Sequence, residues 1–240
     1  MLQTGKQRID QEPAFLLTSV PWRESSLRVE VFSRHYGRLS LLARSARKRQ
    51  SELRGILVPF VPISLSWYGV NELRTLHRAE WIGGWGQPKQ LNLLSALYVN
   101  ELVLKMTARE DPCETLFDAI SGVMQTLSTA SHIQGALRIF EWQLLQSCGY
   151  APDITSDING NPIDDDATYL MQPESPPIFA GNTHDDAIMV HGGTLKALSK
   201  QDFQSDEALR EALILNRMFF NFRLPENLCS RRIMQQLMQY

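Results

Sequence analysis

The stretch Leu27-Arg28-Val29-Glu30-Val31 decides the fold of the first third of this chain. Apolar residues alternate there with charged ones, which is the period-two pattern of a β-strand with one buried and one solvated face. Short apolar runs lie on either side of this stretch, and turn signals such as Tyr36-Gly37-Arg38 and Gly69-Val70-Asn71 separate them. The pattern predicts five strands, at residues 14–20, 27–31, 39–42, 56–68 and 73–81.

No helical pattern separates these five segments. Five short strands are better accommodated in a closed barrel than in an open sheet, because an open sheet exposes two long unpaired edges. Pro21 is expected to end the first strand, and Pro59 and Pro62 mark the fourth segment as an edge or bulged strand in part. We therefore expect residues 1–82 to form a five-stranded oligonucleotide-binding barrel, the OB-fold.

The sequence pattern of residues 83–240 predicts a mostly helical structure. Glycines at 83, 84 and 86 with Pro88 mark a linker at 83–90, and a helical domain is expected at 91–240. Its apolar residues have helical spacing at 91–106, 112–127, 133–148, 194–200, 206–221 and 230–240. Residues 150–193 contain five of the twelve prolines, and we expect them to form a long irregular insertion with brief strands at 168–171 and 188–190. The predicted class is a multidomain β + α protein.

Charge is unevenly distributed along the chain. Residues 1–90 have fourteen lysines and arginines against seven acidic residues, a net +7, while residues 91–240 have ten against nineteen, a net −9. There is no apolar leader and no run of about 18–20 apolar residues, so we expect a cytoplasmic protein without a membrane span. Three widely spaced cysteines, Cys113, Cys148 and Cys229, argue against a disulfide framework and against a CxxC metal knuckle.

The basic run Arg44-Ser-Ala-Arg47-Lys48-Arg49, followed by Arg54, lies between two strands of the expected barrel. A dense set of long cations on a short loop is suited to a phosphate backbone, although such a run is also often just a solvated surface. Arginines on neighbouring elements and the aromatic residues Trp22, Tyr36, Trp67 and Tyr68 could add contacts, although at least half of these aromatics are expected to be core. The predicted DNA-binding residues are Arg23, Arg44, Arg47, Lys48, Arg49, Arg54 and Arg74.

Signatures of catalysis are missing from the sequence. It contains no Walker, GxGxxG, GxSxG, HExxH or kinase motif. The acidic triplet at 164–166 and the group His184, Asp185, Asp186 and His191 resemble a metal or hydrolase site most, but they fall in the irregular insertion and fit a solvated acidic loop. We predict no catalytic residue, no metal and no cofactor. A metal-dependent phosphohydrolase, or a protein-binding adaptor without DNA affinity, stays open as an alternative.

Arg138 stands alone among apolar residues of a predicted helix that includes Leu137 and Leu145. The simpler interpretation is an arginine that extends to solvent or pairs with Glu141. The other interpretation is a binding site for a peptide end, in which Arg138 binds the terminal carboxylate and Leu137 and Leu145 contact its apolar side chain. Composition does not choose between them.

Several strings together resemble the RecO family of bacterial recombination mediators. They are Pro21-Trp-Arg-Glu-Ser-Ser-Leu27, Phe32, Gly37-Arg-Leu39, the basic run through Ser51-Glu-Leu-Arg-Gly55, Leu57-Val-Pro-Phe60, Leu73-Arg-Thr-Leu76 with Glu80, Tyr98-Val-Asn-Glu-Leu102, and Ala136-Leu-Arg-Ile-Phe-Glu-Trp-Gln-Leu-Leu145 with Gly149-Tyr150. Each string is weak alone, but their order and spacing are specific and cover nearly the whole chain.

This resemblance implies an OB-fold barrel and a helical domain that bind single- and double-stranded DNA. It further implies annealing of strands coated by single-strand binding protein, loading of RecA together with RecR, and a place with the nucleoid in the cytoplasm. The basic-run residues would contact DNA, and Arg138 would lie where the acidic, Phe-ended C-terminal tail of single-strand binding protein is captured. Some members hold zinc with four cysteines after the third helix. Here only Cys148 is present, so 150–193 is expected to be a degenerate, metal-free version of that module.

Overall fold

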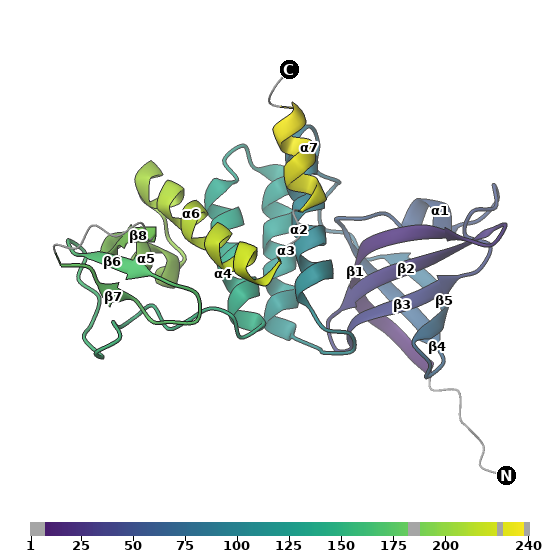
Figure 1. Ribbon diagram of the computed structural model, residues 1–240. Coiled ribbons are helices and arrows are strands. Elements are labelled where there is room, and N and C mark those ends of the chain that lie inside the picture. The colour runs from purple at the N-terminus through teal and green to yellow at the C-terminus, as the bar shows by residue number, and fades with distance from the viewer. Residues whose placement is uncertain (1–7, 182–187, 225–227, 238–240) are drawn as a thin grey trace, which may run out of the picture. The chain divides into compact units, whose positions relative to one another are not determined.

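The five predicted strands close into a barrel in the structure, a computed structural model that describes residues 8–181, 188–224 and 228–237. The strands are β1 (Arg8–Trp22), β2 (Ser26–Ser33), β3 (Gly37–Ala43), β4 (Pro62–Tyr68) and β5 (Leu73–Trp81), with a one-turn helix, α1 (Leu53–Ile56), between β3 and β4. Their order is β1-β2-β3-β5-β4, and β1 pairs with β4 to complete the closure (Figure 1). The pairs are antiparallel except β3 with β5, which run parallel. The predicted five-stranded closed barrel is confirmed.

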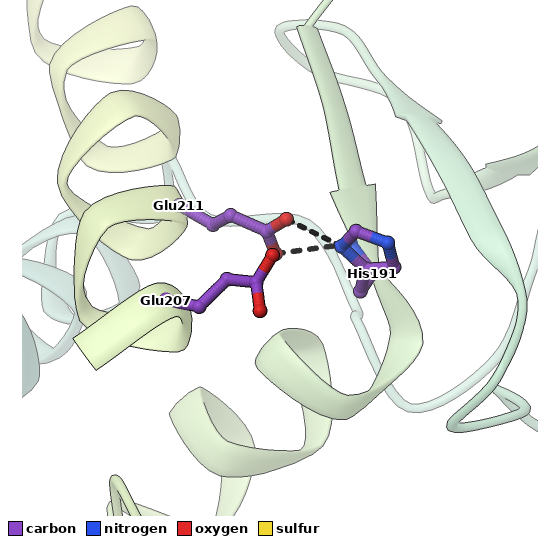
Figure 2. A group of neighbouring side chains, drawn as sticks. All are labelled: His191, Glu207 and Glu211. Atoms are coloured by element: carbon purple, nitrogen blue, oxygen red, sulfur yellow. Dashed lines mark hydrogen bonds and ion pairs between the residues drawn. The ribbon is translucent and has the colours of Figure 1, made fainter. Parts of the chain in front are cut away.

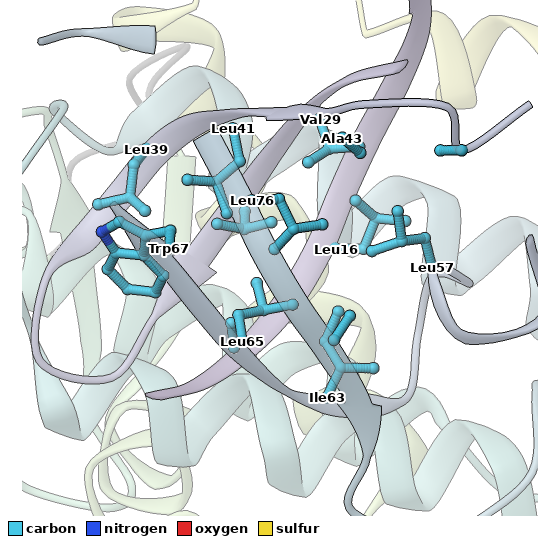
Figure 3. Close-up of a cluster of buried hydrophobic side chains, with 14 residues drawn as sticks. Leu16, Val29, Leu39, Leu41, Ala43, Leu57, Ile63, Leu65, Trp67 and Leu76 are labelled. Carbon is cyan, nitrogen blue, oxygen red and sulfur yellow. The ribbon is translucent and has the colours of Figure 1, made fainter. Parts of the chain in front are cut away.

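Alternate residues of the strands fill the barrel, as the period-two pattern predicts. Val29 and Val31 of β2 are fully buried, and so are Leu41 of β3 and Leu65 of β4. Figure 3 shows these strands directing leucine, valine and isoleucine side chains, with the indole of Trp67, into one apolar cluster. Trp67, considered above as a stacking surface, is 1% exposed and therefore belongs to the core.

The first strand is longer than predicted, and Pro21 does not end it. β1 pairs with β4 only over its first half, from Arg8 to Phe15, and with β2 from Ala14 to Trp22. Pro21 thus lies opposite Leu27 of β2 in a part of β1 that has no β4 partner. A proline is tolerated there because one side of the strand needs no amide donor.

The fourth strand also differs from its prediction. It begins at Pro62, so the residues from 57 to 61 lie outside it, and it pairs with both β1 and β5. It is therefore not an edge strand. Pro62 is accommodated because the first residue of a strand is a position where proline is allowed.

Two helices pack against the barrel, α2 (Leu91–Met106) and α3 (Glu114–Thr129). The register of β1 against β2 shifts between Leu16 and Thr18, and the amide of Asn100 on α2 donates to the freed carbonyls of Leu16 (3.0 Å) and Leu17 (3.1 Å). The α2–α3 connection also covers the predicted solvated face of β2. Glu30 is consequently buried, at 8% exposure, where the strand pattern had predicted a wet position.

The chain divides into two compact units, 1–130 with 233–240, and 131–232. The first contains the barrel with α2 and α3, whereas the sequence had suggested a boundary at 83–90. Trp85 in that segment donates its indole N–H to the carbonyl of Phe60 (2.9 Å). The expected domain boundary at 83–90 stays a prediction.

The second unit is mostly helical and contains a small sheet. Its elements are α4 (Gln134–Ser147), β6 (Thr168–Met171), β7 (Ile178–Phe179), β8 (Ile188–His191), α5 (Gly192–Lys200) and α6 (Asp206–Arg223), and α7 (Cys229–Leu237) follows. The two strands predicted in the insertion pair with each other, and β7 adds a third, unpredicted strand in the order β7-β6-β8. No helix in the described ranges is long and apolar enough to cross a bilayer.

Candidate nucleic-acid interface

Two loops at one end of the barrel are tied together by backbone contacts. The amide of Arg47, after β3, donates to the carbonyl of Ser25 in the β1–β2 turn (2.8 Å), and the Arg47 guanidinium reaches the carbonyl of Arg23 (3.4 Å). The amide of Ser45 also donates to the hydroxyl of Ser26 (3.4 Å). Arg23, which is distant from the basic run in sequence, is therefore placed beside it.

We call the cations on these loops and on α1 the basic rim: Arg23, Arg44, Arg47, Lys48, Arg49 and Arg54. All six side chains are exposed. Within the described ranges none of the six makes an ion pair with a carboxylate, Glu52 included. Their charge is consequently available to an external anion.

The arginines on the barrel strands behave differently, because each one is paired. Arg8 contacts Asp10 (2.8 Å) and Arg78 contacts Glu80 (2.7 Å) along the same strand. Arg28 and Arg38 both contact Glu30, at 3.2 Å and 3.6 Å. Each arginine of the barrel strands thus has a carboxylate partner, which Arg28 and Arg38 share, whereas the rim cations have none among the described residues.

Arg74, predicted as a DNA contact, belongs to the paired group. Its Nη2 lies 3.0 Å from Oε1 of Glu110 in the α2–α3 connection, and its side chain is 13% exposed. Arg74 is therefore not brought to the rim. Its predicted role in DNA binding stays untested, but its charge is already compensated.

Two cavities open among the rim residues, each of about 380 Å³. Ser45, Lys48 and Arg49 border the first, and Arg47 and Arg54 border the second together with leucines that include Leu27 and Leu53. Cations thus surround concave spaces large enough for a phosphate group. The aromatics proposed for stacking do not border either cavity, and Tyr36 packs edge-on against the buried Trp67 (ring centroids 5.4 Å apart).

The second unit buries the residues predicted to capture a peptide. Arg138 is 8% exposed, and its Nη2 donates to Oε1 of Glu141 (2.8 Å). Asn216 on α6 donates to Oε2 of the same carboxylate (2.9 Å). Leu137 and Leu145 are also buried. This arrangement matches the simpler interpretation of Arg138, an internal ion pair, and the peptide site stays a prediction.

Only part of the acidic groups considered for catalysis lies within the described residues. His184, Asp185 and Asp186 lie outside the described residues, and the exposed triplet at 164–166 uses Asp165 to pair with Lys196 (2.5 Å). His191 instead contacts Glu211. No local pattern predicts this His–Glu contact, because the two residues belong to different elements and a solvated acidic loop was expected before His191.

The comparisons with known proteins agree over both parts of the chain. Residues 8–85 match the family model described as "Recombination protein O N terminal", and residues 90–232 match "Recombination protein O C terminal". A "DNA repair protein RecO" of Neisseria gonorrhoeae (strain NCCP11945) is 52% identical over 241 residues, 98% of each chain. Proteins of the same name from Azoarcus sp. (strain BH72) and Chromobacterium violaceum are 41% and 38% identical, over 98% and 99% of this chain and 98% of their own.

Proposed function

The chain belongs to the RecO family of DNA repair proteins, and on this premise we propose that its barrel binds single- and double-stranded DNA through the basic rim. The observation that supports this most is the contrast in pairing, since every strand arginine has a carboxylate partner and none of the six rim cations has one within the described residues. Unpaired cations displace the counterions of a phosphate backbone, and this displacement is the main source of sequence-independent affinity.

The proposed action on DNA is strand annealing without catalysis. Two complementary strands repel each other through their phosphates, and this repulsion slows a pairing reaction that is already favourable. Rim cations bound to both strands would reduce it and so raise the annealing rate. No bond is made or broken in this mechanism, and the rim itself offers no nucleophile with a neighbouring base.

The proposed setting is recombinational repair in the bacterial cytoplasm, in association with the nucleoid. Family resemblance supports annealing of strands coated by single-strand binding protein, capture of that protein's C-terminal tail by the second unit near Arg138, and loading of RecA together with RecR. The net negative charge of residues 91–240 favours protein partners over DNA for that part of the chain.

The test replaces Arg47, Lys48 and Arg49 together by alanine and measures DNA binding by fluorescence anisotropy at several salt concentrations. Every phosphate that the protein no longer binds lowers the slope of log K against log salt by about 0.9 for duplex and about 0.7 for single-stranded DNA, so the slope of the triple variant should be smaller by about 2–3 units. Its annealing rate should fall with the affinity.

A matched pair of single variants supplies the control. Lys48→Ala and Arg78→Ala remove the same charge from exposed positions, but Arg78 is already paired with Glu80. Only Lys48→Ala should lower the slope. An unchanged slope in the triple variant would refute the proposal. Wild-type protein that binds no DNA would favour the adaptor, and metal-dependent release of phosphate from DNA would favour the hydrolase.

A further inference from the structure

Three side chains with metal-binding atoms converge in the second unit, on two different elements. His191 is the last residue of β8, and Glu207 and Glu211 lie one turn apart on the same face of α6. Figure 2 shows both carboxylates directed toward the imidazole. Each residue offers one atom that could bind a metal ion, and these three atoms lie within 4.8 Å of one another.

Glu211 is held in place by three donors. Its Oε1 lies 2.5 Å from Nδ1 of His191, and its Oε2 accepts from the backbone amide of His191 (3.1 Å) and from the hydroxyl of Thr194 (2.5 Å). Glu207 differs, because it makes no hydrogen bond or ion pair with another described residue. The group therefore combines two potential metal ligands that hydrogen bonds hold in place, His191 and Glu211, with a third, Glu207, that is free to move.

The surroundings of the group have an excess of negative charge. His191 and Glu207 border an open cavity of about 440 Å³, which is also bordered by Asp165, Asp202 and the lysines at 196 and 200. Together with Glu211 beside it, the cavity has four carboxylates against two lysines, a net charge of −2 when the imidazole is neutral. A divalent cation would compensate that charge.

We propose that His191, Glu207 and Glu211 form a binding site for a divalent transition-metal ion, with Zn²⁺ as the best-fitting ion. Imidazole and carboxylate oxygens are common zinc ligands, with bonds of about 2.0–2.2 Å, and an imidazole disfavours Mg²⁺ and Ca²⁺. Tetrahedral bonds of that length hold donors about 3.3 Å apart. The site reaches this spacing when His191 and Glu211 separate slightly and the unpaired Glu207 moves inward.

The proposed ion has a structural consequence. It would add a coordination link between the end of β8 and the first turns of α6, which are now joined by the hydrogen bonds of Glu211 with His191 and Thr194. The fourth position faces the open cavity, where water can occupy it. This site uses none of the cysteines and none of the rim residues, so it is independent of the proposed DNA binding.

The experiment titrates chelator-treated, full-length protein with Zn²⁺ by calorimetry and with Co²⁺ by visible absorption. We expect one ion per chain, tetrahedral Co²⁺ bands without a thiolate charge-transfer band, and a higher Tm with Zn²⁺. Glu207→Gln and His191→Gln should each weaken binding at least tenfold. Glu207→Gln removes one negative charge from the first turn of α6 and no hydrogen bond or ion pair within the described structure, so it should lower the metal-free Tm no more than Asp206→Asn does in the same turn.

Two control variants test whether the effect is local. Asp206→Asn removes the same charge one residue from Glu207, and His132→Gln removes another exposed histidine. Both should bind like wild type. The proposal fails if the protein takes up no ion at stoichiometric Zn²⁺, if a thiolate band shows that cysteines are the ligands, or if Glu207→Gln and His191→Gln bind as tightly as the controls.

Discussion

At the scale of single residues, the availability of each charge depends on its neighbours more than on its exposure. Arg78 and Lys48 are both exposed, yet Arg78 has Glu80 at 2.7 Å and Lys48 has no carboxylate partner within the described structure. Arg74 pairs with Glu110, from a connection that a local reading of the sequence could not place beside it. The sequence therefore predicts where cations are numerous, and the structure shows which of them are unpaired.

Glu30 shows how a buried carboxylate is kept ionised in the barrel wall. Burial alone would raise the pKa of Glu30, but a hydrogen bond from Ser40 and the nearby Arg109 (2.9 Å) together hold that pKa below its ordinary value of 4.5. Arg28 adds a third donor at 3.2 Å. The ionised form is therefore the one that stabilises the folded state.

The first prediction concerns acid stability. Because the pKa of Glu30 is lower in the folded than in the unfolded state, its contribution is complete above about pH 4.5 and is lost as pH falls through the folded value. Glu30→Gln should cost about 1–3 kcal/mol of unfolding free energy at neutral pH, because it removes a charged acceptor from Ser40 and leaves the mostly buried Arg38 without its carboxylate. Its stability should then decline less than that of wild type between about pH 5 and about pH 3.

Chemical denaturation across this pH range measures the effect. Glu80→Gln is the control, because Glu80 forms a single exposed pair with Arg78 whose loss should cost less than about 1 kcal/mol. If Glu30→Gln and wild type lose stability in parallel as the pH falls, the carboxylate of Glu30 is not the group responsible.

At the scale of elements, the β2–β3 turn is fixed by the segment that covers it. Gly37 begins β3 with φ +64°, a backbone conformation that side chains rarely adopt. A Cβ there would lie 2.3 Å from the backbone oxygen of Asp111 in the α2–α3 connection. The amide of Glu110 also donates to the carbonyl of Arg38 (2.9 Å), so turn and connection are joined by backbone groups.

We expect Gly37→Ala to destabilise the first unit by more than about 1 kcal/mol, because strain at positive φ adds to a clash with backbone that has little room to move. Gly122→Ala on α3 is the matched control, since nothing lies within 4 Å of its added Cβ and alanine is the better helix former. Thermal unfolding of both variants decides the matter. If Gly37→Ala and Gly122→Ala had equal Tm values, the backbone of the turn and of the connection would be able to shift and accommodate the added Cβ at little cost.

Sequence periodicity predicted element types well and their limits less well. The alternation in β2 and the helical spacing in α2 depend on near neighbours, so they could be read directly. The length of β1 could not be predicted in this way. Pro21 fits into this strand because β4 no longer pairs with β1 at that point, and the sequence around Pro21 does not show where that pairing ends. The third strand of the small sheet, β7, has two residues and leaves no period to detect.

At the scale of the whole molecule, the two units differ in net charge, and contacts between elements decide which arginines have acidic partners. Unit 1 (residues 1–130 with 233–240) has sixteen lysines and arginines against twelve acidic residues, a net +4, and unit 2 has eight against fourteen, a net −6. Acidic residues that follow the barrel in sequence pair with arginines away from the rim. Glu114 and Asp118, for example, contact Arg34. The excess positive charge is therefore concentrated at one end of the barrel.

A comparison of annealing on two substrates should separate the proposed roles of the two units. The triple variant of Arg47, Lys48 and Arg49 should slow annealing of both bare strands and strands coated by single-strand binding protein. Arg138→Lys keeps the charge beside Glu141 but loses the two-pronged guanidinium, and it should slow annealing of coated strands alone. Stopped-flow fluorescence measures both rates.

Arg217→Lys, an exposed arginine on α6, is the control for Arg138→Lys. The Tm of each variant must first be compared with wild type, because Arg138 is buried. If the two variants anneal coated strands equally fast, the tail of single-strand binding protein is not captured at Arg138.

The sequence by itself determined the element types, the barrel class and the position of the basic run, because periodicity and local charge are properties of neighbouring residues. The tertiary structure decided which charges remain unpaired. It joined Arg23 to the basic run, compensated Arg74 and brought His191 to Glu211. These contacts join residues on different elements, and their partners depend on how the chain closes its loops, which no local pattern records.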